Sequence, residues 1–324
     1  MQVLVTGGLG FLGHAVTVNL IAAGHRVTVM SRGRADAKPA TGAELVTADI
    51  RDRVRVAEIV QAGDFDGVCH LAAVTSGRDS IADPLTYFDV NASGTLNLLM
   101  ALDKTRERRP PVAFVLASTN IVYGSRHVGA LSEDLDVHPE SPYAASKVAA
   151  EQMVTAYAAT GAIGAVILRC FNIAGAVDGV TDTDPARIIP NILRAITGQA
   201  PHITLNGDGS AIRDFVHVAD AADAFHLALT KCEPGQHQVY NIGSGTGTRM
   251  ADVVAAAEQV TANRITIRQL PAKPEPLNLT ADIARATRKL GWRPQRSELW
   301  AMLGGAWEAW PSAGQHEART ATFG

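Results

Sequence analysis

The strongest constraint on the fold is a glycine-rich segment at residues 3–13, which reads VLVTGGLGFLG. A short apolar run predicts a buried strand, the residues that follow predict a helix, and the glycines fall in the turn between them. Gly7 would allow the tight turn, Gly10 would let the backbone approach a pyrophosphate, and Gly13 would let the helix pack closely on the strand. The helix would then present its first amide groups, at Phe11 and Leu12, to the anion. The segment therefore predicts a dinucleotide site, and a glycine-rich surface turn is the alternative for the pattern taken alone.

Short apolar runs alternate with alanine-rich segments of helical period along the first half of the chain. Such alternation is typical of a parallel sheet covered by helices. The expected strands and helices form two βαβαβ halves. This arrangement predicts an α/β fold with a Rossmann-type, doubly wound parallel sheet. The expected strands are 3–6, 26–30, 44–47, 67–71, 113–118 and 165–169, and the expected helices are 14–23, 54–61, 84–104 and 143–160.

The regular alternation ends after Arg169, which predicts a second, smaller α/β domain for the substrate. Val216, Val218 and residues 239–242 indicate short strands, and apolar stretches at 188–197 and 250–260 indicate helices. The predicted division is a dinucleotide-binding domain at 1–171, with the chain returning to it around 214–243, a substrate domain at 172–213 and 244–310, and a flexible tail at 311–324.

Composition excludes several other classes of protein. The 324 residues carry a net charge of −3, which leaves no basic surface for nucleic acid. No stretch approaches the ~20 apolar residues of a membrane span, and no basic leader precedes the first strand. Cys69, Cys170 and Cys232 lie too far apart for a zinc or redox motif and are expected to be reduced core residues. These observations predict a cytoplasmic, metal-free protein without nucleic-acid or membrane partners.

A tyrosine and a lysine in the segment SPYAASK at 141–147 are the candidate catalytic pair. Tyr143 and Lys147 stand four residues apart and so share one face of a helix. Lowering a phenol pKa from about 10 to about 7 requires roughly 4 kcal/mol of preference for the phenolate. An ammonium at about 4 Å supplies roughly that amount at an effective dielectric of ~20, and an oxidised nicotinamide would add to it.

The alternative for this pair is an ordinary helix start capped near Ser141. The position of the Tyr143–Lys147 pair favours a catalytic role, because the pair follows the fifth strand, whose end carries the hydroxyls of Ser118 and Thr119. In doubly wound sheets, ligands bind at that edge. We therefore expect proton transfer at Tyr143.

The end of the second strand selects between NAD and NADP, because a carboxylate there binds the ribose hydroxyls whereas an arginine accommodates a 2′-phosphate. Ser31 and Arg32 occupy this place, and Arg34 follows. The sequence thus favours NADP, and solvated loop arginines with NAD bound are the alternative. Further cofactor contacts are expected after the third and fourth strands, from Asp49, Ile50, Leu71, Ala72 and Ala73.

Several motifs together resemble the extended short-chain dehydrogenase/reductases: the segments 6–13, 70–73 and 118–124, and Tyr143 with Lys147. Within that superfamily, the segments 83–91, 168–172 and 212–218 are most similar to UDP-glucose 4-epimerases and their relatives, in the NAD-dependent epimerase/dehydratase family. The likeness covers nearly the whole chain. It implies a nucleotide-diphosphate sugar as substrate and a homodimer formed through the helices at 84–104 and 143–160.

The resemblance also implies roles for single residues. Tyr143 would be the base, Lys147 its electrostatic partner and a ribose ligand, and Thr119 the hydroxyl that shares a proton with the sugar oxygen. Asn172 and Arg213 would hold the diphosphate, and a structural pair of Arg213 with Asp214 is the alternative. The other implied contacts are Asn91, Ser118 and Phe171 for the cofactor, and Arg187, Ile188, Thr204, Asn206 and Lys273 for the substrate.

The residues after Thr119 separate 4-epimerases from their relatives. Sugar-nucleotide 4,6-dehydratases resemble this chain but carry an Asp-Glu pair there, and related decarboxylases keep the Glu. Asn120 and Ile121 cannot transfer that proton, which argues against dehydration and decarboxylation. Asn172 similarly matches hexose epimerases better than relatives acting on sugar acids, for which the resemblance implies a threonine.

The leading hypothesis is therefore a nucleotide-sugar 4-epimerase. An NADPH-dependent 4-ketoreductase, which would explain Arg32, is the second, and a non-catalytic dinucleotide sensor is the third. Arg187 and Asn206 depart from the UDP-glucose pattern, which favours a specialised sugar.

Overall fold

The computed structural model describes residues 1–33, 38–272 and 276–310, and its first strand explains why a sheet forms at the centre of the molecule. In β1 (Gln2–Thr6), the side chains of Val3, Leu4 and Val5 are fully buried. Val3 and Val5 belong to one hydrophobic cluster and Leu4 belongs to another. Because successive side chains on a strand point to opposite faces, both faces of this sheet must be covered.

The central sheet has seven strands in the order β13-β7-β5-β4-β1-β2-β3. All neighbours are parallel, which confirms the predicted doubly wound sheet. The carboxyl ends of the strands therefore lie along one edge. The other strands are β2 (Arg26–Ser31), β3 (Glu44–Thr47), β4 (Gly67–His70), β5 (Val112–Thr119), β7 (Ile163–Cys170) and β13 (His237–Ile242).

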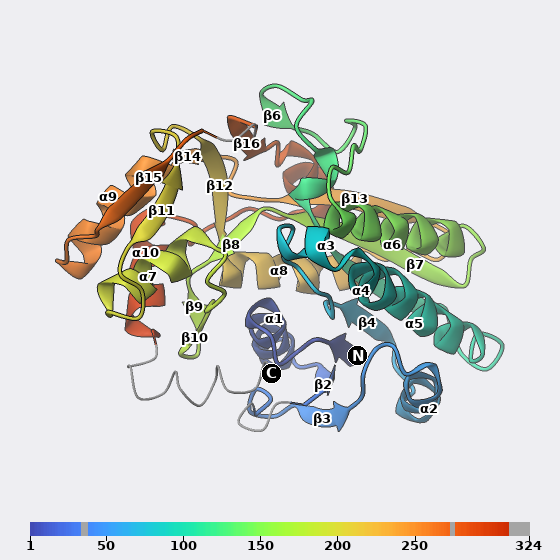
Figure 1. Cartoon of the computed structure of the whole chain (residues 1–324). Coiled ribbons are helices and arrows are strands. Elements are labelled where there is room, and N and C mark those ends of the chain that lie inside the picture. The colour runs from blue at the N-terminus through green and yellow to red at the C-terminus, as the bar shows by residue number, and fades with distance from the viewer. Residues whose placement is uncertain (34–37, 273–275, 311–324) are drawn as a thin grey trace.

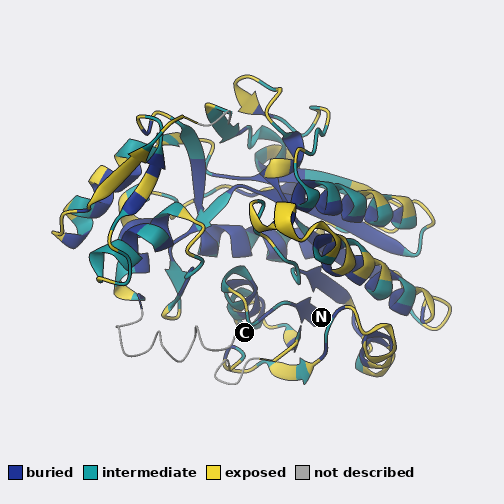
Figure 2. Ribbon diagram, in the orientation of Figure 1, coloured by how far each residue is buried: buried dark blue, intermediate teal, exposed yellow. Residues whose placement is uncertain are grey.

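Helices cover both faces of the sheet. On one face lie α1 (Phe11–Ala22) and α8 (Val218–Thr230), whose Leu20 and Phe225 share the cluster of Val3. On the other face lie α2 (Arg53–Gly63), α5 (Gly94–Asp103) and α6 (Pro142–Ala158), which contribute to the cluster of Leu4. Figure 1 shows this arrangement, and in Figure 2 the inner strands of the sheet are buried, whereas the edge strand β3 is largely exposed.

The predicted helix at 84–104 is helical throughout but not regular. It consists of α4 (Pro84–Tyr87), a π-helical turn η1 (Phe88–Ser93) and α5, and it is preceded by the short α3 (Asp79–Ala82). The π turn buries the side chains of Val90 and Asn91 on the inner side. Such turns occur often at functional sites, and this one positions Asn91 beside the catalytic helix.

A second, smaller α/β region lies on the far side of the molecule from α2 and α5 (Figure 1). Its central strand β12 (Ile212–His217) pairs with β8 (Asn172–Ala174) and β16 (Asn278–Ala281) in parallel and with β14 (Gly247–Arg249) in antiparallel orientation. Its hydrophobic cluster is separate from those of the central sheet. The remaining elements are β6 (Ala130–Leu131), β9 (Ala176–Val177), β10 (Val180–Thr181), β11 (Ile203–Asn206), β15 (Ile267–Leu270), α7 (Ile188–Ile196), α9 (Met250–Thr261), α10 (Leu299–Glu308), η2 (Asn120–Tyr123) and η3 (Ala286–Leu290).

The expected strand at Val218 is wrong, because this residue begins α8. The Nδ1 atom of His217 accepts a hydrogen bond of 3.0 Å from the amide of Ala219 and so caps the helix. Alanine-rich sequence then carries the helix to Thr230. Local alternation of valines around His217 resembles a strand, but the cap and the alanines decide the outcome.

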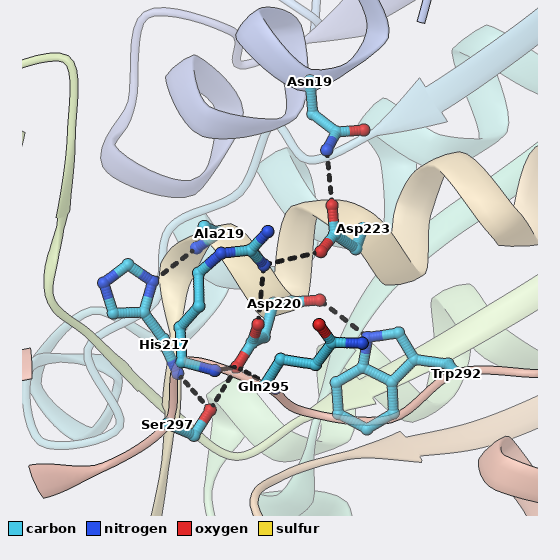
Figure 3. A network of polar contacts seen from close by, with 9 residues as sticks. Asn19, His217, Ala219, Asp220, Asp223, Trp292, Gln295 and Ser297 are labelled. Atoms are coloured by element: carbon cyan, nitrogen blue, oxygen red, sulfur yellow. Dashed lines mark hydrogen bonds and ion pairs between the residues drawn. The ribbon is translucent and has the colours of Figure 1, made fainter. Parts of the chain in front are cut away.

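A buried carboxylate on α8 holds the segment before α10 (Figure 3). The side chain of Asp220 has no exposed surface. It accepts hydrogen bonds from the amides of Gln295 and Arg296, from the Arg296 guanidinium and from the Ser297 hydroxyl, at 2.7 to 2.9 Å. The indole of Trp292 donates to the Asp220 carbonyl at 2.7 Å. Asp220 thereby links α8, which covers the central sheet, to the segment that leads into the second region.

Some sequence predictions fall outside the described residues. These are Arg34, Lys273 and the tail at 311–324. In the described part of the chain, no helix is long and apolar enough to cross a membrane, and Cys69, Cys170 and Cys232 form no disulfide.

Candidate active site

The glycine-rich turn has the geometry needed to receive a pyrophosphate. Gly7 has φ of 74°, a conformation that favours glycine, and a Cβ there would lie 2.8 Å from the amide nitrogen of Ala72. A Cβ on Gly13 would lie 2.2 Å from the Gly7 carbonyl oxygen. Gly10 precedes α1 without a side-chain cap, and the first turn carries no acidic residue. The first amides of α1, at Phe11 and Leu12, therefore suit an anion, and the turn fits a dinucleotide.

A chain of hydrogen bonds fixes the backbone where β4 ends. The Thr6 hydroxyl accepts from the amides of Leu71 and Ala72 at 3.2 and 3.1 Å and lies 2.7 Å from His70 Nδ1. It must therefore donate to Nδ1, which leaves the imidazole proton on Nε2, 3.0 Å from the Thr95 hydroxyl. Burial, together with the charge of Lys147, lowers the pKa of His70 to about 3, so this imidazole is neutral. Sequence analysis missed His70 because its partners come from β1 and α5.

Asn91 joins the loop after β4 to the catalytic helix. Its side chain accepts from the amide of Val74 at 2.9 Å and donates to the Val74 carbonyl and to the Ser146 hydroxyl, both at 3.0 Å. Ser146 in turn donates to the Tyr143 carbonyl. Both amino protons of Asn91 are thus engaged within the protein, so its expected support of the cofactor site would act through the positions of Val74 and Ser146.

Tyr143 and Lys147 both lie buried on α6, one turn apart. The helix begins at Pro142, and the Ser141 hydroxyl accepts from the amide of Ala144 at 3.2 Å, so the cap expected at Ser141 exists alongside the pair. Thr119, the last residue of β5, is also buried, and its hydroxyl lies close enough to the Tyr143 side chain to oppose the rise in the tyrosine pKa. The structure thus brings all three expected catalytic side chains to the carboxyl edge of the sheet.

The electrostatic expectation for Tyr143 is wrong for the protein alone. Burial raises its pKa to about 12, and the nearby Thr119 hydroxyl and the charge of Arg187 only partly oppose this effect. Lys147 is not among the main influences on this pKa in the protein alone, because burial lowers the pKa of Lys147 to about 8 and the lysine is already neutral where the phenol titrates. Dehydration of the phenolate therefore outweighs attraction in this state.

The Ser118 hydroxyl, expected at the cofactor site, is engaged within the protein. Its hydroxyl donates a short hydrogen bond to Glu151, which also forms a buried ion pair with Arg169 at 2.7 Å. We call Ser118, Lys147, Glu151 and Arg169 the inner cluster. Sequence analysis did not identify Glu151, although its spacing of four from Lys147 was visible in the sequence.

Arg187, which was expected to bind substrate, lies near Tyr143 and is held by acids of its own loop. It contacts Asp182 at 3.0 Å and Asp184 at 3.6 Å, and its Nη2 lies 3.5 Å from the Thr75 hydroxyl in the loop after β4. We call Asp182, Asp184 and Arg187 the outer cluster. The contact with Thr75 links the outer cluster, on the expected substrate side, to the loop after β4, which flanks Tyr143.

Asn172 and Arg213 lie on the paired strands β8 and β12. The Asn172 side chain donates to the Asp214 carbonyl at 2.9 Å, and Arg213 donates to the carbonyls of Ile212 and Pro276 at 2.8 and 3.0 Å. The Asp214 carboxylate instead accepts from the amides of Ser244, Gly245 and Ala281 at 2.6 to 3.0 Å. The alternative of an Arg213 pair with Asp214 is therefore wrong, because alternation along β12 sends the two side chains to opposite faces.

The other expected contacts are spread over four places. Phe171 is buried in a small hydrophobic cluster with Tyr123 and Ala281, and Ile188 begins α7. Thr204 and Asn206 lie on β11, which pairs with β15 and not with β12. Near the expected adenosine position, Ser31 is partly buried and Arg32 is exposed.

Asp49 and Ile50, which follow β3, leave little freedom for the cofactor contacts predicted there. The Asp49 carboxylate binds the Arg51 guanidinium at 2.8 and 3.1 Å, and this bond lowers the pKa of Asp49. The Ile50 side chain is buried in the core, so only its backbone could meet a ligand.

Comparison with known proteins agrees with this geometry. The model of the NAD dependent epimerase/dehydratase family matches residues 3–243. A UDP-glucose 4-epimerase of Streptomyces lividans is 36% identical over 322 residues and that of Corynebacterium glutamicum is 33% identical over 319 residues, with 96% and 95% of both chains covered. The structure of UDP-glucose-4-epimerase from Stenotrophomonas maltophila, with bound NAD and formylated UDP-arabinopyranose, matches with a TM-score of 0.88 and 30% identity over 99% of both chains. This chain therefore belongs to the NAD-dependent epimerase/dehydratase family of extended short-chain dehydrogenase/reductases and is most like the UDP-glucose 4-epimerases.

Proposed function

We propose that this protein is a nucleotide-sugar 4-epimerase acting on a UDP-hexose. The observation that carries the proposal is the meeting of Thr119, Tyr143 and Lys147 in a buried site at the carboxyl edge of a doubly wound sheet, on the edge that also carries the glycine turn. The related structures contain NAD and UDP-sugars, which supports the same ligands here. Asn120 and Ile121 provide no acid for dehydration.

The side chains have distinct tasks in this reaction. Tyr143 accepts the proton of the sugar 4-hydroxyl, and Thr119, whose hydroxyl lies near the phenol, shares that proton with the sugar oxygen. As the O–H and C4–H bonds break, a C4 carbonyl forms. A bound nicotinamide dinucleotide would supply hydride acceptance and return at C4. Asn172 and Arg213 hold the diphosphate while the 4-keto sugar rotates, and Tyr143 then returns its proton to the C4 oxygen of the other epimer.

Tyr143 must lose its proton for this chemistry, yet burial holds the pKa of the phenol at about 12 in the protein alone. The positive charge of an oxidised nicotinamide, added to those of Lys147 and Arg187, would favour the phenolate. We infer that the base becomes active only once the cofactor is bound.

Ser31 and Arg32 support a proposal about which nicotinamide cofactor is bound. No carboxylate stands at the end of β2, and Arg32 is exposed there, which favours a 2′-phosphate and hence NADP. NAD, found in the related structures, is the alternative. If NADPH is oxidised to NADP with net reduction of a 4-keto sugar, the protein is a 4-ketoreductase.

The experiment that tests the function is NMR of the purified protein incubated with UDP-galactose or UDP-glucose, first without added cofactor and then with NAD or NADP. We expect interconversion without net change in nicotinamide absorbance, and Tyr143→Phe should lose at least about a hundredfold in rate. Cofactor binding should survive in this variant. No conversion of either sugar, with turnover of a 4-keto sugar at the expense of NADPH, would replace the epimerase by the ketoreductase.

We also propose a cytoplasmic homodimer that pairs α4, α5 and α6. Leu85 of α4, Phe88 of η1 and Leu96 of α5 are exposed, which supports burial against a second copy. Sedimentation at micromolar concentration should give twice the monomer mass, and a monomer alone would refute the dimer.

A further inference from the structure

We propose that Glu151 is a positioning residue that keeps Lys147 protonated inside the active site. The inference rests on the proposed function in one respect, because it assumes that the charge of Lys147 assists Tyr143. It assigns a task to a buried carboxylate that touches neither the expected sugar nor the expected cofactor.

The carboxylate of Glu151 is fixed from two strands. Arg169 on β7 donates to it through Nη2 at 2.7 Å and through Nε at 3.2 and 3.3 Å. Ser118 on β5 donates to the Oε1 atom. Both partners of the ion pair are about nine-tenths buried, with 8% of each side chain exposed. The negative charge therefore has one position, and solvent does not screen it.

Lys147 needs such a charge because it is itself buried, with 4% exposed. Removal from water disfavours an ammonium. This desolvation lowers the pKa of Lys147 to about 8, and Glu151, one turn further along α6, is the main influence in the opposite direction. The ammonium is thus about nine-tenths formed at pH 7, by a margin of only one pH unit.

The other groups around Lys147 do not supply a negative charge. From β4, His70 is neutral, because its pKa is lowered to about 3. From β7, the Cys170 thiol is buried and its pKa is raised to about 12, so it is protonated at neutral pH, and Arg169 is a cation. From β5 and η1 come the uncharged Thr119 and Asn91. Among these groups Glu151 is the one anion.

Without the Glu151 carboxylate, the pKa of Lys147 would no longer lie above pH 7. Desolvation alone can lower the pKa of a buried lysine by up to several units, so a fall of about two is expected after Glu151→Gln. The charged fraction of Lys147 at pH 7 would then drop to about one tenth. The alkaline limb of the activity profile should move by the same amount toward lower pH, and activity at pH 7 should fall about tenfold.

The decisive readout is the titration of Lys147 itself, followed by NMR of protein with ¹³C-labelled lysine and assigned with Lys147→Arg. In the wild type we expect a midpoint near pH 8, because burial lowers the pKa of Lys147 to about 8, and in Glu151→Gln a midpoint about two pH units lower. Glu151→Asp, which retains the charge, should recover at least half of the difference. The titration needs no sugar, so a wild type that fails to epimerise would sink the proposed function and leave this inference standing.

Glu151→Gln leaves Arg169 buried without its partner and could fail to fold. The double variant Glu151→Met with Arg169→Met removes both charges and keeps the interior neutral. It should show a lower Lys147 midpoint as well. A midpoint within half a pH unit of wild type in the folded variant, single or double, would overturn the proposal. Equal loss of activity at all pH values, in Glu151→Asp as much as in Glu151→Gln, would also overturn it and would leave Glu151 a structural residue.

Discussion

The inner and outer clusters contain the same chemistry in different surroundings. Each joins an arginine to a carboxylate, at 2.7 Å for Arg169 with Glu151 and at 3.0 Å for Arg187 with Asp182. Arg169 has 8% of its side chain exposed, whereas Arg187 has 41%. The distances alone would rank the two ion pairs as nearly equal. The pairs differ in how far each arginine is buried, and burial sets both the strength of the electrostatic interaction and the loss of stability when one partner is removed.

The two clusters also act on different catalytic groups. The inner cluster adjusts the charge of Lys147 through Glu151, whereas Arg187 of the outer cluster lowers the pKa of Tyr143. A buried carboxylate beside a lysine and an exposed guanidinium near a tyrosine both favour the charged forms. We expect large effects that are independent of salt from the first and small effects that depend on salt from the second.

The largest expected difference is in stability after removal of one arginine. Arg169→Met leaves Glu151 buried without its cation and should lower the free energy of unfolding by about 3 to 5 kcal/mol. Arg187→Met, the matched change in the outer cluster, should lower it by less than about 1 kcal/mol. Urea unfolding of both variants at pH 7 measures the contrast. Equal losses would mean that burial does not separate the clusters.

A smaller difference is expected when one hydroxyl is removed from each cluster. Ser118→Ala deletes the hydrogen bond to the buried Glu151 carboxylate and should lower the free energy of unfolding by about 1.5 to 3 kcal/mol. Thr75→Val deletes a contact of 3.5 Å to the half-exposed Arg187 and should change it by less than about 0.5 kcal/mol. The same urea titrations serve, and a loss at Thr75 as large as that at Ser118 would show that the outer contact is stronger than its geometry indicates.

The contrast between the clusters also explains what could be predicted from the sequence. The strands of the central sheet and the glycine turn were predictable because each rests on local pattern, such as the valines around Leu4 or the spacing of Gly7, Gly10 and Gly13. Tyr143 and Lys147 were predictable for the same reason, since four residues of helix bring them onto one face.

Features that depend on contacts between distant parts of the chain could not be predicted from local sequence patterns. His70 and Glu151 receive their tasks from partners on other strands and helices, which no spacing reveals. The raised pKa of Tyr143 was missed because attraction by Lys147 is visible in the sequence, whereas burial is not. In the second region, β8, β14 and β16 have only three or four residues each and depend on pairing with β12, which is distant in the sequence. Such short strands carry too little periodicity to be recognised.

The smallest expected effect is the pH dependence contributed by the outer cluster. Arg187 lowers the pKa of Tyr143, so Arg187→Gln should raise that pKa and move the acidic limb of the activity profile toward higher pH. The guanidinium is exposed by two fifths and lies beside two acids, so the move should be less than about half a pH unit.

Salt separates this effect from that of the inner cluster. Because about 0.5 M salt screens exposed charges within a few ångströms, it should move the acidic limb of the wild type in the same direction and leave Arg187→Gln unchanged. The alkaline limb, which follows Lys147, should not respond to salt in either protein, because Glu151 is shielded from solvent. An acidic limb that moves by more than one pH unit in Arg187→Gln and ignores salt would contradict this account, since Arg187 would then act on Tyr143 as strongly as a buried charge.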